Sequence, residues 1–540
     1  MTAALALWAA LGLAHAPPPF RPGPPALVVL IAIDQMRADY FDRFGSQFTG
    51  GLARLRSGTF FRHGRQDHAM TETAPGHSTM LSGRDPARTG IVSNTLGVAD
   101  PLAPVIGAPG ELGASPRRFI GSTLYDWMLA ADSDAQVLSV SRKDRGAIFP
   151  VGRARGAVFW YAAGCFTTSR YYADTLPTWV LAYNAKGGPA SLAGAVWRPL
   201  LPDSAYPEPD SMAYENGGSN VAFPHALPTQ PDSAAARLAA FPWMDSLTLD
   251  FAVAGMRSMG LGRRERPDLL VVSLSTTDAI GHAFGPDSRE IHDHPLHVDR
   301  WLGAFLDSLS AAVDGREVVV VLTSDHGVTS FPEYLAGVRH QKAGRVSIAD
   351  VARLAGQRLA ARYRMDFGVG VDNGLLSADV PALKSRGVNV DSLATALAAS
   401  VRQRPGVADV FTPAALARAS GQSVTAGRWR RLLPAGYGWL VAVSLKPGYV
   451  WSDGKLSAEH GGMGDDDVEV PIAFMGPGIP RATVLRPVRT VDIGPTLAAY
   501  LNVAPTEPVD GRVLREVLPG SLATPPRPRP SIQAAGPRTR

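Results

Sequence analysis

Residues 27–34 read LVVLIAID, seven apolar and largely β-branched residues that stop at an aspartate. Two later runs end in the same way: residues 269–278 read LLVVSLSTTD, and residues 318–325 read VVVVLTSD. Continuous apolar runs of this length predict strands that are buried on both faces, as in a parallel sheet covered by helices. We therefore predict an α/β fold, with a mainly parallel sheet flanked by helices on both faces.

The three runs bring carboxylates to one edge of the predicted sheet. All strands of a parallel sheet end at the same edge, which is where such folds place their sites. Like charges gathered at a dry edge are unfavourable unless positive groups neutralise them. Asp34, Asp278 and Asp325 therefore predict bound metal ions.

Composition limits the classes of protein that the chain can be. Its 540 residues allow one large α/β domain with insertions, or two or three smaller domains. The net charge is +5, but arginines concentrate only in the C-terminal tail and no basic-aromatic stripe is present. We therefore expect no nucleic-acid partner, and the mild positive charge suits a small anionic substrate. No stretch after the N-terminal run is long and apolar enough for stable membrane insertion, and we expect a monomer.

The N-terminus predicts export. Residues 3–13 are apolar and are followed by Ala-His-Ala before a proline cluster, as in a signal peptide, although the run has no Lys or Arg ahead of it. We expect a periplasmic or secreted protein, with a frayed apolar N-terminus as the alternative. With Cys165 as the single cysteine, no internal disulfide can form.

Composition shifts predict how the rest of the chain is organised. Residues 170–242 are irregular and rich in Pro, Gly, Ser and Asn, and residues 330–446 have their own alternation of helices and strands. The predicted parts are a signal peptide (1–16), the core in three pieces (17–169, 243–329 and 447–522), a cap insertion (170–242), a second insertion forming a small α+β cap (330–446) and a disordered tail (523–540).

Residues 71–83 read TETAPGHSTMLSG, and they predict a helix that opens at Thr73, because Pro75 suits a first helical turn. A hydroxyl at this place has free N–H groups and the positive end of the helix dipole behind it, which favours an anion. By itself a Thr ahead of a helix is more often an N-cap than a nucleophile.

Seven short sequence blocks favour the nucleophile over the N-cap at Thr73, because together they resemble the alkaline phosphatase superfamily. The resemblance is to its type I phosphodiesterase/nucleotide pyrophosphatase branch, and within that to the phosphate-insensitive, broad-specificity alkaline phosphatases with a Thr nucleophile. The blocks are 32–37 (AIDQMR), 73–77 (TAPGH), 90–94 (GIVSN), 143–147 (KDRGA), 277–282 (TDAIGH), 324–327 (SDHG) and 459–461 (EHG). The resemblance implies an alkaline-phosphatase-like fold.

The resemblance also implies two divalent cations, with Zn²⁺ as the expected ion. The first ligand group would be Asp34, Asp325 and His326, and the second ligand group would be Asp278, His282 and His460. Carboxylate oxygens and imidazole nitrogens suit zinc, and three protein ligands leave a position open. Taken singly, each of these residues could instead be an ordinary capping or core residue. His292, His294 and His297 lie outside the blocks, and we expect them on the surface.

In this interpretation Thr73 is the nucleophile, coordinated by a metal ion because a free alcohol is too weakly acidic to attack at neutral pH. It would form a phosphothreonine intermediate. Asn94 would position a phosphoryl oxygen. Lys143 and Arg145 would lie on the same side of an extended segment, with Asp144 pointing away, and would bind the dianion of a monoester. The alternative for this block is a solvated charged turn.

We therefore predict an exported two-metal alkaline phosphatase that acts on small-molecule phosphate esters. The alternative is a phosphodiesterase or nucleotide pyrophosphatase on the same scaffold. A sulfatase is disfavoured because Thr-Ala-Pro-Gly replaces the Cys or Ser motif that formylglycine needs. A non-enzymatic phosphate-binding protein is disfavoured because every expected ligand is present.

Overall fold

The computed structural model describes residues 25–95, 97–363 and 369–520. The predicted signal peptide (1–16) and tail (523–540) lie outside these residues. Within them, a central sheet has ten strands. These are β1 (Leu27–Ile33), β2 (Thr59–Arg65), β3 (Val137–Ser141), β4 (Ala157–Ala162), β5 (Cys165–Thr167), β8 (Asp268–Leu274), β9 (Val318–Thr323), β16 (Glu469–Met475), β17 (Ala482–Val484) and β18 (Val488–Arg489).

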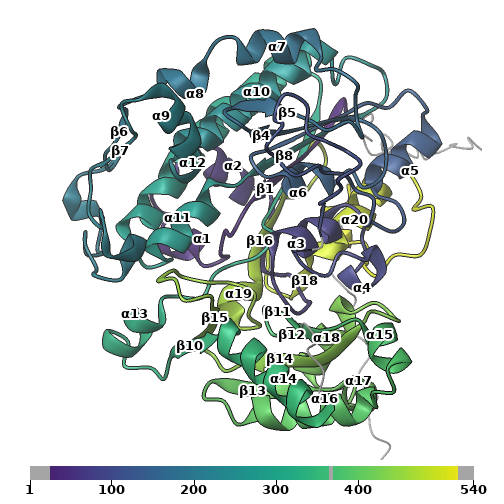
Figure 1. Cartoon of the computed structure of the whole chain (residues 1–540). Coiled ribbons are helices and arrows are strands. Elements are labelled where there is room, and N and C mark those ends of the chain that lie inside the picture. Colours follow the sequence, from purple (N-terminus) through teal and green to yellow (C-terminus); the bar gives the residue numbers. More distant parts are fainter. Residues whose placement is uncertain (1–24, 96, 364–368, 521–540) are drawn as a thin grey trace, which may run out of the picture.

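The order of the sheet is β17-β2-β16-β9-β1-β8-β3-β4-β5, with β18 also paired to β2. Figure 1 labels β16, β1, β8, β4 and β5 of this sheet. The centre is parallel: β1 pairs in parallel with β8 and β9, and β3 with β8 and β4. Antiparallel pairs join β16 to β9 and β2, and β4 to β5. The mainly parallel α/β sheet predicted from the apolar runs is confirmed.

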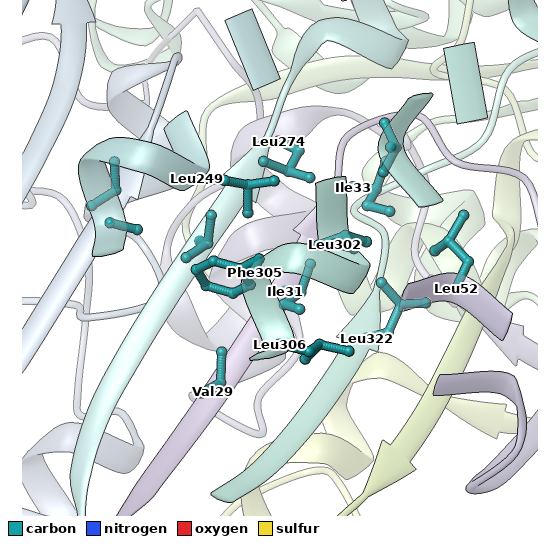
Figure 2. Packing of buried hydrophobic residues seen from close by; sticks show 14 of the residues in the cluster. Val29, Ile31, Ile33, Leu52, Leu249, Leu274, Leu302, Phe305, Leu306 and Leu322 are labelled. Carbon is teal, nitrogen blue, oxygen red and sulfur yellow. The ribbon is translucent and has the colours of Figure 1, made fainter. Parts of the chain in front are cut away.

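Helices cover both faces of the sheet, as expected from a central strand, β1, that is apolar and buried at every position. Val29, Ile31 and Ile33 of β1 pack with Leu302 and Phe305 in one hydrophobic cluster (Figure 2). The helices of this face are α1 (Tyr40–Arg43), α2 (Gly51–Arg56), α10 (Trp243–Met259) and α12 (Arg289–Ala312).

The intervening residues of β1 point to the other face. Val28, Leu30 and Ala32 belong to a second hydrophobic cluster. The helices that contribute to it are α3 (Thr73–Met80), α5 (Leu124–Ala131), α6 (Asp144–Ile148) and α20 (Ile493–Leu501). The alternation along one strand therefore divides the core into two layers, as the period of a strand requires.

Strand register brings the predicted site residues together. Ile33 lies opposite Leu274, and Ala32 lies opposite Thr323, so β1, β8 and β9 end side by side. Asp34 follows β1 directly and Asp325 comes shortly after β9, while Asp278 lies in the first turn of α11 (Thr276–Phe284).

Residues 170–242 form short elements beside the core helices, in the upper left of Figure 1. They are α7 (Thr178–Asn184), α8 (Gly188–Ser191), β6 (Val196–Trp197), η1 (Asp203–Ala205), η2 (Glu215–Gly218), β7 (His225–Ala226), α9 (Pro231–Arg237) and η3 (Leu238–Ala240). Trp197 and Leu227 are buried in the same hydrophobic cluster as α10 and α12.

Residues 330–446 form the green unit at the bottom of Figure 1, with a hydrophobic cluster of its own. Its elements are α13 (Pro332–Gly337), β10 (Gly344–Ser347), α14 (Ile348–Tyr363), β11 (Gly370–Asp372), β12 (Leu375–Ser377), α15 (Val380–Ser385), α16 (Val390–Arg402), β13 (Val407–Phe411), α17 (Pro413–Arg418), α18 (Val424–Leu432) and β14 (Trp439–Leu445). Strands β11, β12, β14 and β13 form an antiparallel sheet, and β10 pairs with β15 (Tyr449–Ser452), which lies beyond residue 446. The domain boundaries stay a prediction.

The remaining elements are α4 (Pro86–Thr89), α19 (Asp465–Val468), η4 (Thr490–Asp492) and η5 (Arg515–Val517). Among the described residues, no helix combines the length and the apolar character needed to cross a membrane.

Candidate active site

Asp34 and Asp325 lie together where β1 and β9 end, and both are fully buried. Nε2 of His326 lies 3.5 Å from Oδ1 of Asp34 and 3.6 Å from Oδ2 of Asp325. The ligand atoms of these three residues lie within 4.8 Å of one another, so they could hold one metal ion. The structure thus brings together the residues of the first ligand group.

The second ligand group lies beside the first. Nε2 of His282 and Nε2 of His460 lie 3.4 Å and 3.7 Å from Oδ1 of Asp278. The rings of His460 and His326 stack, with centroids 3.8 Å apart, and the ligand atoms of Asp278, His326 and His460 also lie within 4.8 Å. The six predicted ligands therefore converge, and His326 lies between the two groups.

Neighbouring groups fix the orientation of these carboxylates. The backbone N–H of Gln35 donates to Oδ1 of Asp325 at 3.1 Å, and its side-chain Nε2 donates to Oδ1 of Asp278 at 3.0 Å. His77 lies with Nδ1 3.2 Å from Oδ2 of Asp325 and Nε2 2.9 Å from Oγ of Ser273. Gln35 thus links the two ligand groups through its backbone and its side chain, and His77 lies within ion-pair distance of Asp325.

The two adjacent carboxyls have opposite pKa shifts. Burial and the negative charge of Asp325 raise the pKa of Asp34 well above its usual value, although Lys143 acts against this. Burial also opposes ionisation of Asp325, but His326 and His77 outweigh it and hold the pKa of Asp325 below its usual value. The chain by itself therefore supplies too little positive charge for both carboxylates.

The donor atoms fit divalent cations. Among the described residues, Oδ1 of Asp34, Oδ2 of Asp325 and Nε2 of His326 are buried without a hydrogen-bond partner. Buried polar atoms are normally satisfied, so a group of neighbouring exceptions indicates an absent partner. Carboxylate oxygens with imidazole nitrogens are the donor set that zinc and related ions take, and a cation would also supply the missing charge.

Thr73 is the first residue of α3 and is buried. The N–H of the next residue, Ala74, donates to Oδ1 of Asn94 at 2.9 Å, which leaves the NH₂ of Asn94 to donate elsewhere. Nζ of Lys143 lies 3.2 Å from Oγ1 of Thr73. The predicted nucleophile, the predicted phosphate ligand and a cationic donor thus share one small volume.

Lys143 is buried and contacts both ligand groups. Its Nζ lies 2.6 Å from Oδ2 of Asp34 and 2.7 Å from Oδ2 of Asp278. The backbone N–H of Lys143 donates to Oγ of Ser141 at the end of β3, which fixes the backbone from which the side chain extends. The alternative that this block is a solvated turn does not hold for Lys143.

Arg145 does not follow an extended segment, and this part of the prediction is wrong. Lys143 is the N-cap of α6, so Arg145 lies inside a helix. Asp144 does not point away: its Oδ1 accepts from the N–H of Arg145 at 2.6 Å and lies 3.5 Å from Nη1 of the same residue. A carboxylate early in a helix favours the helical start, which explains the difference.

Comparison with known proteins places the chain in a family. Residues 28–386 match the family model described as type I phosphodiesterase / nucleotide pyrophosphatase. The chain belongs to this family. Within this family, the chain is 30% identical to the alkaline phosphatase PhoK of Sphingomonas sp over 542 residues, which cover 91% of this chain and 91% of that protein. It is 29% identical to the alkaline phosphatase PhoV of Synechococcus elongatus over 527 residues, which cover 92% and 93%.

Solved structures of this family support the same assignment. The crystal structure of the alkaline phosphatase PafA is 26% identical, with a TM-score of 0.84, and covers 92% of this chain and all of that chain. The fold is therefore that of the alkaline phosphatases, and the chain lies in the branch of this superfamily that includes PafA, PhoV and PhoK.

Some residues of this family member's site were not singled out by the sequence. Gln35 and His77 lie inside the sequence blocks that resemble the family, close in sequence to Asp34 and Thr73. This proximity could have indicated that they belong to the site. Glu72 lies next to Thr73, and its Oε2 accepts from the N–H of Asn94 at 2.7 Å. Burial and Asp372 raise the pKa of Glu72 to about 7.

The prediction that the histidines of α12 lie on the surface is wrong for His292 and His294, which are both buried. Nδ1 of His292 lies 2.7 Å from Oε2 of Glu208, and Nε2 of His294 lies 3.1 Å from Oγ1 of Thr277. The face of α12 that carries them packs against residues 170–242 and α11, so these histidines are structural contacts rather than surface residues.

Proposed function

We propose that this protein is an exported alkaline phosphatase that hydrolyses small-molecule phosphate monoesters to inorganic phosphate through a phosphothreonine intermediate. The observation that carries the proposal is the position of Lys143, whose Nζ lies 3.2 Å from Oγ1 of Thr73. A cation beside the nucleophile suits the dianionic phosphoryl group of a monoester better than the single charge of a diester. The protein is thus a phosphoric monoester hydrolase.

The reaction has two halves. In the first half, Oγ1 of Thr73 gives up its proton to solvent and forms a bond to phosphorus as the bond from phosphorus to the ester oxygen breaks, and the leaving oxygen takes a proton from solvent. In the second half, water attacks phosphorus and gives up a proton to solvent, while the bond from phosphorus to Oγ1 of Thr73 breaks and Oγ1 takes a proton. Inorganic phosphate leaves and the hydroxyl of Thr73 is restored.

The two ligand groups would hold divalent cations, with zinc as the proposed ion. Bound there, the cations supply positive charge that lowers the pKa of an alcohol and neutralises a leaving oxygen. The chain positions the other charges. Asn94 accepts an N–H through its Oδ1 and so has its NH₂ available for a phosphoryl oxygen. Lys143, whose Nζ lies beside Oγ1 of Thr73, and Arg145 would add positive charge for the phosphoryl group.

The named relatives support this assignment. PhoK, PhoV and PafA are each named alkaline phosphatases, and the chain covers nine tenths or more of each. A further solved structure of PafA, 26% identical and with a TM-score of 0.84, has a Thr, an Asn, a Lys and an Arg substituted together. Thr73, Asn94, Lys143 and Arg145 repeat these residue types in the same order, with the same spacing within each pair.

A phosphodiesterase or nucleotide pyrophosphatase is the second candidate, because the matching family model carries that description. A diester leaves one phosphoryl oxygen esterified, so it needs less positive charge and more surface for its second ester group. The buried ammonium of Lys143 argues for the monoester instead.

A comparison of two substrates tests the proposal. An aryl phosphate and its methyl diester are assayed with the same preparation, before and after treatment with a chelator and after addition of zinc. We expect a higher kcat/KM for the monoester, loss of activity with the chelator and recovery with zinc. Faster turnover of the diester would support the second candidate, and activity that resists exhaustive chelation would contradict the two-cation proposal.

Export is proposed from residues 3–16 alone. Fractionation of the producing cells, followed by N-terminal sequencing of the mature protein, tests it. We expect a periplasmic or secreted protein that begins after the Ala-His-Ala of residues 14–16. Recovery of the uncleaved chain in the cytoplasm would contradict it.

A further inference from the structure

Glu72 is a buried carboxylate that the proposed reaction does not use, although it directly precedes Thr73. It is 1% exposed. Its backbone oxygen accepts from the N–H of Gly76 at 3.0 Å, but its side chain does not cap α3. A carboxylate removed from water is unfavourable unless hydrogen bonds hold it. Its contacts therefore indicate what it does.

These contacts lie on two sides. Oε2 of Glu72 accepts from the backbone N–H of Asn94 at 2.7 Å, and Oε1 accepts from Nδ2 of Asn373 at 2.5 Å. The first contact lies within the core and fixes the backbone of the residue that we propose as a phosphate ligand. The second reaches the unit formed by residues 330–446, because Asn373 lies 301 residues further along the chain.

Asn373 lies at the tip of the hairpin between β11 and β12. Asn373 and Gly374 have φ of 37° and 92°, as in the two-residue Asn-Gly turns that close tight hairpins. The tip also reaches Gly461, where an added Cβ would lie 3.0 Å from Nδ2 of Asn373. Since Gly461 follows His460, the tip contacts the surroundings of both Thr73 and the second ligand group.

The hairpin has other contacts that hold it in place. Leu376 is buried in a hydrophobic cluster with residues of β14, and Leu375 is buried in a second cluster that joins β14 to Met70 and Val92 of the core. Asn373 belongs to neither cluster, and its Nδ2 donates to Glu72 instead. The hydrogen bond between Asn373 and Glu72 is therefore better explained by the active site than by the folding of the insertion.

We propose that Glu72 and Asn373 are positioning residues for Asn94, so that the insertion of residues 330–446 sets how firmly the site holds the phosphoryl group. The inference rests on the proposed phosphatase function. Asn373 holds the carboxylate of Glu72 in place, and Glu72 in turn holds the backbone of Asn94. Neither positioning residue touches the substrate.

An exchange of donor and acceptor tests this. Asn373→Asp places a second carboxylate beside that of Glu72. The double variant, Glu72→Gln with Asn373→Asp, restores one hydrogen bond and the original net charge. We expect kcat/KM for an aryl phosphate to fall by about 10- to 100-fold in Asn373→Asp. This factor corresponds to the free-energy cost of one unsatisfied buried polar group. The double variant should recover about tenfold or more. In Asn373→Ala, which removes the donor without adding charge, kcat/KM should fall by about 3- to 10-fold.

Asn389→Asp is the matched control in the same insertion. Asn389 is the N-cap of α16 and accepts from the N–H of Ser392 through Oδ1 at 2.9 Å. Asp is an equally good N-cap, so this variant should keep wild-type activity. A loss in Asn389→Asp as large as in Asn373→Asp would mean that any added charge in the insertion is harmful, and it would overturn the inference.

A second measurement separates positioning from stability. In an Asn94→Ala background the substitution of Asn373 should have little further effect, because the group that it positions is gone. Calorimetry measures the binding of inorganic phosphate to the zinc-loaded protein. In the Asn373 variants this binding should weaken in parallel with kcat/KM. Equal losses with and without Asn94, or wild-type phosphate binding in Asn373→Asp, would overturn the inference. If the wild type hydrolysed no monoester, the proposed function would fail. The comparison of phosphate binding between the wild type and Asn373→Asp would still test whether Asn373 positions Asn94.

Discussion

Gly76 packs directly against the backbone of Asp325. A Cβ at Gly76 would lie 2.2 Å from the carbonyl oxygen of Asp325 and 2.8 Å from its Cβ. Real Cβ atoms do not approach backbone so closely, so the first turn of α3 can lie this near to the end of β9 only because residue 76 has no side chain. The position of Thr73 relative to the first ligand group depends on this contact.

Gly76→Ala should therefore displace Thr73 from the metal ligands. Helix propensity favours Ala, so a loss would come from the contact and not from the helix. We expect kcat/KM for an aryl phosphate to fall by about 100-fold or more, as displacement of reacting groups by about 1 Å does. Gly356→Ala is the control, because Gly356 is also helical and has nothing within 4 Å of an added Cβ. Wild-type activity in Gly76→Ala would contradict the argument.

Lys143→Ala should separate monoesters from diesters. The buried ammonium lies beside Thr73 and would donate to a phosphoryl oxygen, so its loss should lower kcat/KM for an aryl phosphate by about 10²- to 10³-fold. Hydrolysis of the methyl diester should fall much less. Arg145→Ala should show the same preference. Equal losses on both substrates would remove the charge-balancing role that we propose for these residues.

Substitution of Thr73 tests the covalent intermediate. Thr73→Ser keeps a hydroxyl at the start of α3 and should still form a phosphoenzyme, whereas Thr73→Ala should form none and lose at least about 10³-fold in kcat. Intact-mass spectrometry of acid-quenched samples detects the added phosphoryl group. A phosphorylated Thr73→Ala protein would show that another residue is the nucleophile.

Much of this arrangement could be predicted from the sequence, because its elements have strong local signals. The run of residues 27–33 predicts β1 to the residue, and the aspartates after β1 and β9 meet because strands of a parallel sheet end together. By contrast, β2 carries Arg62, His63 and Arg65, so its composition does not indicate a strand, although it lies inside the sheet.

The contacts that adjust the site had weaker signals. The Asn-Gly pair at residues 373–374 predicts a turn, but nothing in its neighbourhood indicates that the turn reaches Glu72. The helical start at Asp144 was missed because a short charged segment fits a turn, a strand or a first helical turn equally well. Long-range contacts of this kind follow from tertiary packing, which local patterns do not encode.

Metal removal should lower both activity and stability. Chelation leaves Asp34 and Asp325 buried together with only the charges of the chain to offset them, so the melting temperature should fall and recover with zinc. Asp34→Asn should lower the bound metal from about two ions per chain to about one, measured by elemental analysis. Asp350→Asn, on an exposed residue, should bind the wild-type amount. Unchanged metal content in Asp34→Asn would remove it from the first ligand group.

The pH dependence of stability should include a contribution from Glu215, which is buried in residues 170–242. Burial and the negative charge of Glu290 raise the pKa of Glu215 to about 8, against an ordinary value of 4.5. Between these two values the folded protein keeps a proton that the unfolded chain has lost. The free energy of unfolding should therefore fall as the pH rises through this window, and the loss should be complete above pH 8.

Glu215→Gln should remove this dependence. Gln keeps an oxygen that can accept from the N–H of Met212, as Oε2 of Glu215 does at 3.1 Å, and it cannot ionise. At pH 5 the variant and the wild type should melt at nearly the same temperature, because Glu215 is protonated in the folded wild type. At pH 9 the variant should melt about 1–3 °C higher, since only the wild type then carries a buried negative charge. Parallel melting curves across this range would mean that Glu215 is ionised in the folded protein at pH 5 already.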